Sequence, residues 1–228
     1  IASSLIRKSA TVGGNLCLDT RCFWYNQSED WRRSIDWCHK ADCGTGADCR
    51  VIPNQNTLCV ATYQGDLAPN FMALGAEVTL VSPEGERKIP LSEFYQLDGM
   101  KKNVLKPGEF MLKITLPKDS FDYTGSYQKL RVRESWDFPE AGISAVWKKG
   151  DYSTLKIAST ALESIPRVHI EQVSEFAASW KKGTSLSELS DAVRKSVKPV
   201  NNTALPPNYR KSVVRILTKR ALKNIGCE

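Results

Sequence analysis

The chain reads A-T-V-G-G-N-L-C-L-D-T-R-C from Ala10 to Cys22, a stretch in which a turn-like pattern runs into the first cysteines. Its adjacent glycines, Gly13 and Gly14, permit backbone conformations that other residues avoid, which predicts a strand passing into a tight turn over Thr11 to Asn15. The main-chain N–H groups of such a turn can approach an anion as large as a pyrophosphate. The Gly-Gly-Asn pattern alone is a weak signal, because most patterns of this kind are simple tight turns.

Cysteines are concentrated downstream of this turn. The chain has seven, and six of them fall between positions 17 and 59: Cys17, Cys22, Cys38, Cys43, Cys49 and Cys59. The seventh, Cys227, is next to the C-terminus. An odd, locally clustered set differs from the evenly paired disulfide framework of a small secreted domain. The clustering favours ligation of a metal or an iron–sulfur cluster.

The spacing of these cysteines bears on which metal they would hold. Four thiolates can hold either a cubane iron–sulfur cluster or a zinc ion. Zinc modules generally use pairs of cysteines separated by two residues, and no such pair occurs in the sequence. From Cys22 onward the gaps are fifteen, four, five and nine residues. This irregular spacing favours a cluster held by a wrapped loop, and a cluster would also stabilise the long, aperiodic segment 17–62.

Other catalytic chemistries have little support in the sequence. There are two histidines. We expect His39, next to Cys38, to contact a ligand residue or to face solvent, and we expect His169 to lie at the surface where a helix opens. No GxSxG elbow, P-loop or GxGxxG pattern occurs, so the sequence does not indicate a serine hydrolase or a common nucleotide-binding enzyme.

The composition is that of a soluble globular protein, with 41% hydrophobic and 25% charged residues among 228. No apolar run approaches the roughly 20 residues that span a bilayer, and the N-terminus lacks a secretory pattern, so we expect a cytoplasmic protein with no membrane association. The net charge of +7 is uneven: 14 basic against 13 acidic residues in 1–118, and 18 against 12 in 119–228. Aromatic and basic residues do not interleave, so nucleic acid is not an expected partner. An anionic cofactor, an acidic partner and a solvated surface all remain open.

Three local patterns organise residues 1–118, which we expect to form the first domain. A short helix is expected with Asp66 as its N-cap and Gly75 as its stop. The turn-forming Ser82-Pro83-Glu84-Gly85 predicts a β-hairpin between two strand-like runs. Alternating apolar and polar residues over 110–116 predict a half-buried strand.

Residues 119–228 are expected to form a second domain, with the boundary near 118–125. Three strand-like runs come first and three amphipathic helices follow. The strands are expected at 127–133, 141–147 and 154–161, and the helices at 170–180, 184–193 (capped by Thr184) and 208–225. Strands followed by helices indicate the α+β class rather than alternating βαβ units.

Four segments together carry a family resemblance: Ala10 to Asn15, Gly65-Asp66-Leu67-Ala68-Pro69, Lys88-Ile89-Pro90-Leu91 and Leu105-Lys106-Pro107-Gly108-Glu109. They resemble the FAD-binding medium subunit of the molybdenum hydroxylase (xanthine oxidase) family. Tyr127-Gln128-Lys129-Leu130-Arg131-Val132-Arg133-Glu134 is similar to the join to that family's C-terminal domain. The insertion, with Asn15 to Cys22 and Tyr25-Asn26-Gln27-Ser28, closely resembles the beta subunit of 4-hydroxybenzoyl-CoA reductase, a branch with an extra [4Fe-4S] cluster on the flavin subunit.

The resemblance implies a fold and a set of site residues. The fold would be the second half of a PCMH-type FAD-binding domain with a Cys-rich insertion, followed by a C-terminal domain of the CO dehydrogenase flavoprotein type, a three-stranded antiparallel sheet packed on helices. The implied FAD contacts are Thr11, Gly13, Gly14, Asn15, Asp66, Met111 and Lys129. The implied cluster ligands are Cys22, Cys38, Cys49 and Cys59. Cys17 is not a ligand in that pattern, and Cys43 competes with Cys49 for the third position because the segment 41–48 departs in length.

The resemblance also implies an electron relay with no substrate site on this chain. Electrons would pass between a ferredoxin-like carrier, the [4Fe-4S] cluster, FAD, a [2Fe-2S] small subunit and a large subunit that carries the molybdenum cofactor. The family's first FAD loop, which lies in an N-terminal subdomain, has no match here. We therefore expect this chain to hold only part of the flavin site.

Two alternatives stay open from the sequence. The chain could serve another enzyme of the same family, acting on a purine, an aldehyde or carbon monoxide, because substrate choice lies on the large subunit. It could instead be a zinc-stapled interaction module whose basic half binds an acidic partner.

Overall fold

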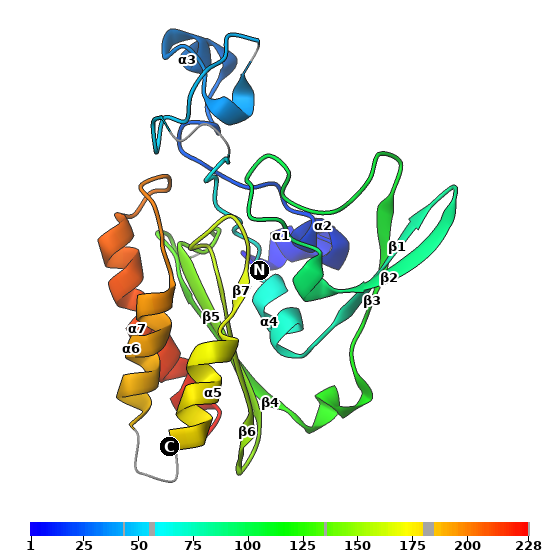
Figure 1. Cartoon of the computed structure of the whole chain (residues 1–228), viewed down its shortest axis with the longest axis vertical. Helices are drawn as coiled ribbons and strands as arrows, with labels where there is room; N and C mark the ends of the chain where they lie inside the picture. The colour runs from blue at the N-terminus through cyan, green and yellow to red at the C-terminus, as the bar shows by residue number, and fades with distance from the viewer. Residues whose placement is uncertain (43, 55–57, 135, 180–184, 228) are drawn as a thin grey trace.

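The computed structural model describes residues 1–42, 44–54, 58–134, 136–179 and 185–227. Its strands form two antiparallel sheets that are joined by the short helix η3 (Lys118–Asp122) (Figure 1). One sheet has the order β2 (Gly85–Pro90), β1 (Glu77–Ser82) and β3 (Phe110–Thr115), and the other has the order β4 (Thr124–Leu130), β5 (Ala141–Lys148), β6 (Asp151–Thr160) and β7 (Arg167–Val168). The expected α+β class is confirmed.

The predicted hairpin is present as β1 and β2. Their register pairs Glu77 with Pro90 and Ser82 with Gly85, and Gly85 has a φ of 132°, which suits glycine at the turn. Strand β3 pairs with the other edge of β1. The alternation that predicted β3 does not bury one full face, because Phe110 and Leu112 remain 55% and 51% exposed while Met111 packs partly against the core.

The segment from Thr11 to Asn15 is not the predicted strand and turn. It forms the short helix α2 (Val12–Leu16), which follows α1 (Ser4–Ser9). Thr11 is the N-cap, and its Oγ1 accepts a hydrogen bond of 2.9 Å from the N–H of Gly14. Such a cap contributes about 1 kcal/mol, and the fully buried Leu16 adds apolar burial. Together these offset the entropic cost of two glycines in a helix.

The helix predicted after Asp66 is α4 (Ala68–Ala73), and Gly75, with a φ of 74°, follows its end as expected. The predicted cap is wrong, because Leu67 occupies the N-cap position. The Asp66 carboxylate instead binds side chains of β4. A long-range ion pair therefore replaces the local capping role that the sequence suggested.

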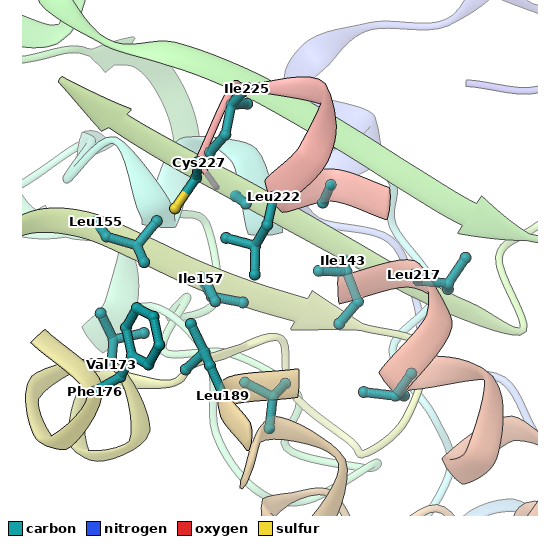
Figure 2. Packing of buried hydrophobic residues seen from close by; sticks show 14 of the residues in the cluster. Ile143, Leu155, Ile157, Val173, Phe176, Leu189, Leu217, Leu222, Ile225 and Cys227 are labelled. Atoms are coloured by element: carbon teal, nitrogen blue, oxygen red, sulfur yellow. The ribbon is translucent and has the colours of Figure 1, made fainter. Parts of the chain in front are cut away.

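The four-stranded sheet is covered on both faces. Helices α5 (Ile170–Ser179), α6 (Leu186–Ser196) and α7 (Pro207–Asn224) bury one face, and Figure 2 shows Ile143, Leu155 and Ile157 of the sheet among residues of these helices. On the other face, Val146 and Ala158 pack against Ala73 of α4. This double burial explains the continuous apolar run of β5. Three strands were expected, and the two-residue β7 is a fourth that is too short to be seen in the sequence.

The three C-terminal helices lie close to their predicted positions. The capping residue of α6 is Ser185, whose capping box with Glu188 is complete. The predicted cap Thr184 lies outside the described residues. Within the ranges given above, no helix combines the length and apolarity needed to cross a membrane.

His169 is not the surface residue that the sequence suggested. It is 1% exposed, and its two ring nitrogens lie 2.9 Å from the Ser159 hydroxyl and 3.0 Å from the Ser196 hydroxyl. Burial lowers the pKa of His169 to about 4, so the ring is neutral at physiological pH. The helix that follows it packs back onto β6, which encloses the imidazole.

The cysteine-bearing segment 17–62 contains little regular structure. Its only helices among the described residues are α3 (Glu29–Ser34) and the single turn η1 (His39–Ala41). The tip of the segment, with α3, projects beyond the two sheets (Figure 1). The segment returns to the body where Arg21 and Thr62 pair their backbones in both directions at 2.7 Å.

Candidate functional site

Four of the residues implied as cofactor contacts line one cavity. Thr11, Gly14 and Asn15 contribute from the α2 segment, and Asp66 contributes from the chain just before α4. The opposite wall comes from the segment 133–138. The cavity, which we call the loop cavity, has a volume of about 460 Å³. This lies within the range of about 300–1,000 Å³ that is usual for small-molecule sites.

Asp66 is the charged centre of the loop cavity. Its side chain is buried and receives a 2.9 Å hydrogen bond from the Tyr127 hydroxyl. The Lys129 ammonium lies 3.0 Å from the same carboxylate and donates 2.7 Å to the carbonyl oxygen of Asp137. Burial and, after it, the Asp66 charge hold the pKa of Tyr127 well above its usual value, so its hydroxyl keeps its proton as a donor.

Asn15 joins α2 to the chain that leads into α4. Its side-chain Oδ1 accepts a 2.9 Å hydrogen bond from the N–H of Leu67, and its carbonyl oxygen accepts one of 3.0 Å from the Tyr63 hydroxyl. The two loops that carry Thr11 and Asp66 are therefore held together by Asn15. Any ligand in the loop cavity meets both loops in one fixed arrangement.

The remaining implied contacts are placed differently. Gly13 and Met111 line a separate cavity on the β3 side of α2, which Thr11 also borders. Lys129 reaches the loop cavity through its ion pair with Asp66. The structure thus gathers Thr11, Gly14, Asn15 and Asp66, with Lys129 behind them, and separates Gly13 and Met111 from this group.

The four cysteines implied as ligands border a second, narrow cavity. Cys22, Cys38, Cys49 and Cys59 are each between 6% and 7% exposed, and the cavity that they share, here called the cysteine cavity, is also bordered by His39 and Lys40. Across the ranges that the structure describes, no three His, Cys, Asp or Glu side chains lie close enough together to hold a single metal ion. The four thiols therefore surround a shared space instead of converging on one point.

The other cysteines are elsewhere or outside the described residues. Cys17 follows α2 and packs partly against the core around β1, and Cys227 is buried among the helices under the four-stranded sheet (Figure 2). Cys43 lies outside the described residues. Of the two residues that competed for the third ligand position, the structure places Cys49 at the cavity.

The thiols of the cysteine cavity meet backbone N–H groups. The N–H of Ile52 lies 3.5 Å from Cys49 Sγ and that of Ala61 lies 3.4 Å from Cys59 Sγ. The nearby N–H groups of Trp24 and Tyr25 act to lower the pKa of Cys22 against the larger effect of burial, and the N–H of Tyr25 donates to the Cys22 carbonyl oxygen at 3.0 Å. Such donors stabilise sulfur that carries negative charge, as a metal-bound thiolate does.

Burial keeps the thiols of Cys22 and Cys59 protonated in the absence of a cation. Burial is the largest cause that raises the pKa of Cys22 to about 11 and the pKa of Cys59 to about 11, and the charges of neighbouring cysteines add to it. A bound metal centre reverses this balance, because its positive charge deprotonates a coordinating thiol. These two thiols would therefore act as ligands only to a cationic centre.

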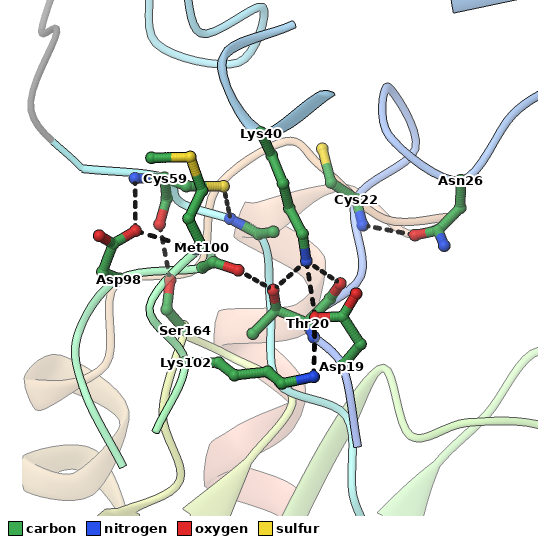
Figure 3. Close-up of polar contacts among 12 residues, drawn as sticks. Asp19, Thr20, Cys22, Asn26, Lys40, Cys59, Asp98, Met100, Lys102 and Ser164 are labelled. Atoms are coloured by element: carbon green, nitrogen blue, oxygen red, sulfur yellow. Dashed lines mark hydrogen bonds and ion pairs between the residues drawn. The ribbon is translucent and has the colours of Figure 1, made fainter. Parts of the chain in front are cut away.

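A polar network connects Lys40 of the cysteine cavity with Asp19 and Thr20, in the chain that follows α2 (Figure 3). The Lys40 ammonium, with a side chain only 8% exposed, donates to Asp19 Oδ1 at 2.8 Å and to both oxygens of Thr20 at 2.7 and 2.9 Å. Lys102 lies 3.2 Å from the same Asp19 carboxylate. The Thr20 hydroxyl in turn donates to the Gly99 carbonyl.

Gly99 is packed directly against the cavity. A Cβ atom at this position would lie 2.8 Å from Cys59 Sγ and 2.9 Å from the backbone nitrogen of Ala61. Asp98 helps to hold this approach, since its Oδ1 accepts 3.1 Å from the N–H of Cys59. Sequence reasoning missed Gly99 and Lys40, because neither belongs to a local motif and both act on residues far along the chain.

The loop cavity and the cysteine cavity are neighbours. A third cavity of about 450 Å³ shares Phe138 and Arg133 with the former and Cys22 with the latter. Across it, the guanidinium of Arg21 lies 4.2 Å from the centre of the Phe138 ring. Because Arg21 precedes Cys22, a single side-chain contact joins the two sites.

Comparisons with known proteins identify the family of the first half of the chain. Residues 1–119 match the family described as FAD binding domain in molybdopterin dehydrogenase. The chain is similar to the aldehyde oxidoreductase FAD-binding subunit PaoB of Escherichia coli K12, with 30% identity over 150 residues, which is 64% of this chain and 47% of that protein. It is also similar to the carbon monoxide dehydrogenase medium chain of Afipia carboxidovorans, with 26% identity over 69% of this chain and 54% of that protein. The chain thus spans about half the length of these relatives.

A solved structure shows the same fold. Carbon monoxide dehydrogenase from Hydrogenophaga pseudoflava superposes with a TM-score of 0.62 and 22% identity, over 72% of this chain and 56% of that chain. At this identity the likeness concerns the fold, and it confirms the PCMH-type arrangement expected from the sequence. The family match covers slightly more than half of the residues and includes both loops of the loop cavity. The chain therefore belongs to the family of FAD-binding domains in molybdopterin dehydrogenases.

Proposed function

We propose that this chain is an electron-transfer subunit that contains FAD and a [4Fe-4S] cluster and serves a molybdenum-dependent oxidoreductase similar to 4-hydroxybenzoyl-CoA reductase. The observation that carries the proposal is the placement of four buried thiols around one cavity next to the loop cavity of an FAD-binding domain. The contact between Arg21 and Phe138 connects the two sites. When bound, FAD exchanges two electrons in single steps and the cluster transfers one at a time.

The loop cavity supplies the protein's part of flavin binding. Thr11, Gly13, Gly14 and Asn15 are proposed to hold the phosphate end, and Asp66, Met111 and Lys129 the flavin end. Thr11 and Asn15 hold the α2 segment in place through the hydrogen bonds described above. The buried Asp66 presents a fixed acceptor, oriented by Tyr127 and Lys129.

The cysteine cavity supplies the cluster ligands. Cys22, Cys38, Cys49 and Cys59 are proposed to bind the four irons of a cubane. The half-buried Trp24 and Tyr25 pack over two of these residues and limit the access of water. Low water access and the N–H donors to sulfur are the protein's means of setting the potential of a cluster.

The partners follow from the same proposal. We infer a large subunit with the molybdenum cofactor, a [2Fe-2S] small subunit and an external ferredoxin-like carrier, in the cytoplasm. Residues 1–118 would form the flavin and cluster unit, and residues 119–228 the C-terminal domain. A second candidate is the flavin subunit of an aldehyde-oxidising member of the family, which the 30% identity to an aldehyde oxidoreductase subunit favours. Identification of the large subunit by co-purification separates the two candidates.

Analysis of the anaerobically purified holoenzyme tests the proposal directly. Iron, acid-labile sulfide, zinc and flavin are measured for each copy of this chain. We expect FAD and, beyond the content of the small subunit, the iron and sulfide of one cubane cluster. Zinc in place of this iron would show the stapled module instead, and iron without flavin would contradict the role of the loop cavity.

Gly14→Val should lower the FAD content of the holoenzyme severely. A Cβ atom at Gly14 would lie 2.8 Å from Thr11 Oγ1, so the substitution breaks the cap of α2 and crowds the loop cavity. Flavin absorbance per protein measures the effect. Val12→Ala is the matched comparison, because Val12 lies in the same helix, is 45% exposed and does not line the loop cavity. Normal flavin occupancy in a folded Gly14→Val protein would refute the assignment of this loop.

A further inference from the structure

One polar atom of the cysteine cavity has no partner. His39 Nε2 is buried, and it makes no hydrogen bond with any residue that the structure describes. The residue borders the cysteine cavity together with the four cysteines. Since buried polar atoms in folded proteins are almost always satisfied, this nitrogen is available to a partner beyond the described residues.

The backbone around His39 is held on two sides. Its N–H donates to the carbonyl oxygen of Asp48 at 3.2 Å, which links His39 to the segment that carries Cys49. The next residue, Lys40, is fixed by three hydrogen bonds and lies with its ammonium 4.3 Å from the Tyr25 ring centre. The hydrogen bonds of the His39 backbone and of Lys40 therefore hold this part of the chain at the cavity.

The sulfur atoms of the cysteine cavity differ in the hydrogen-bond donors that lie near them. Backbone N–H groups hydrogen-bond to the sulfur atoms of Cys49 and Cys59, and the N–H groups of Trp24 and Tyr25 act on the pKa of the Cys22 thiol. Within the described ranges, no hydrogen bond to the sulfur of Cys38 is found. His39 follows Cys38 in the chain, lines the same cavity and has a buried ring nitrogen without a partner among the described residues.

We propose that His39 donates a hydrogen bond from Nε2 to a sulfur atom of the iron–sulfur cluster in the cysteine cavity and thereby raises the reduction potential of that cluster. The inference rests on the proposed function, since it requires the cluster. Reduction adds one electron from the external carrier, and an N–H donor stabilises the additional negative charge on sulfur. Four thiolates already complete the ligand set of a cubane, so His39 acts as a donor and not as an iron ligand.

A redox titration of the holoenzyme tests this role. The cubane signal is followed by EPR while the potential is varied, and iron and sulfide are measured in parallel. His39→Leu should keep the full iron and sulfide content and shift the midpoint potential to a more negative value. His39→Gln, which retains a side-chain N–H, should restore part of the shift. An unchanged midpoint in His39→Leu would overturn the proposal, and loss of the cluster would show a ligand or structural role instead.

Pulsed EPR of the unmodified protein gives a second test that does not depend on the folding of a variant. The holoenzyme is labelled with ¹⁵N-histidine and reduced, and nitrogen couplings are recorded at the field positions of the cubane signal. We expect a weak coupling, as from a hydrogen-bonded nitrogen. A strong coupling would show a direct iron–nitrogen bond, and no coupling would show that the ring does not contact the cluster; either result overturns the proposal.

The matched control is His169→Gln. Both ring nitrogens of His169 already lie within hydrogen-bonding distance of serine hydroxyls. Its replacement should leave the midpoint potential and the weak coupling unchanged. Loss of the coupling in this variant would show that the coupling comes from His169 and not from His39. A wild-type holoenzyme without cubane iron contradicts the proposed function itself, and a normal cluster with an unshifted potential in His39→Leu contradicts only the role of His39.

Discussion

Cys22→Ser should leave the holoenzyme without the iron and sulfide of its cubane cluster. Cys22 lines both the cysteine cavity and the cavity that adjoins the loop cavity, and it is 7% exposed. A serine hydroxyl is a harder and much less acidic ligand than a thiol and cannot replace the thiolate of a cubane. Electron exchange with a ferredoxin should fall with the iron content, while flavin should stay bound.

The matched controls for this experiment are Cys17→Ser and Cys227→Ser. Both remove a thiol that lies away from the cysteine cavity. Iron and sulfide per chain should equal those of the unmodified protein in both variants. Full iron content in Cys22→Ser would remove this residue from the ligand set, and loss of iron in Cys17→Ser would move the set toward the α2 segment.

Asp66→Ala should destabilise the chain by about 3–5 kcal/mol, because it leaves the mostly buried Lys129 ammonium without its carboxylate. The Tyr127 hydroxyl loses its acceptor in the same step. FAD content should also fall, since the fixed acceptor of the loop cavity disappears. Urea denaturation gives the free energy of unfolding, and absorbance gives the flavin content.

A surface ion pair provides the comparison for Asp66→Ala. Asp122 lies 3.5 Å from the Lys148 ammonium, and its side chain is 65% exposed. Asp122→Ala should therefore change the free energy of unfolding by at most about 1 kcal/mol. If the two substitutions cost the same, the Asp66–Lys129 pair is not the buried link that the structure describes.

Local patterns were predictable where neighbouring residues determine the structure. The hairpin around Gly85 and the helix that stops at Gly75 depend on turn and capping residues a few positions apart. The three C-terminal helices depend on apolar residues at helical spacing. Such signals survive in the sequence because the interactions behind them are short in range.

Predictions failed where a distant contact decided the outcome. Asp66 was expected to cap a helix, but its carboxylate pairs with Lys129, 63 positions away. His169 was expected at the surface, but the packing of α5 and α6 encloses it between two serines. The Gly-Gly segment was expected to turn, but the cap by Thr11 and the burial of Leu16 make it helical.

The amino-acid sequence by itself determined the class of the fold, the hairpin and helices, and the crowding of cysteines into one segment, because spacing and local propensity are written along the chain. Only the tertiary structure decided which of those thiols share a cavity, that His39 borders it and Gly99 packs against Cys59, and that a contact between Arg21 and Phe138 connects it with the loop cavity. Burial, desolvation and side-chain contact depend on residues that are far apart in sequence and meet only once the chain has folded.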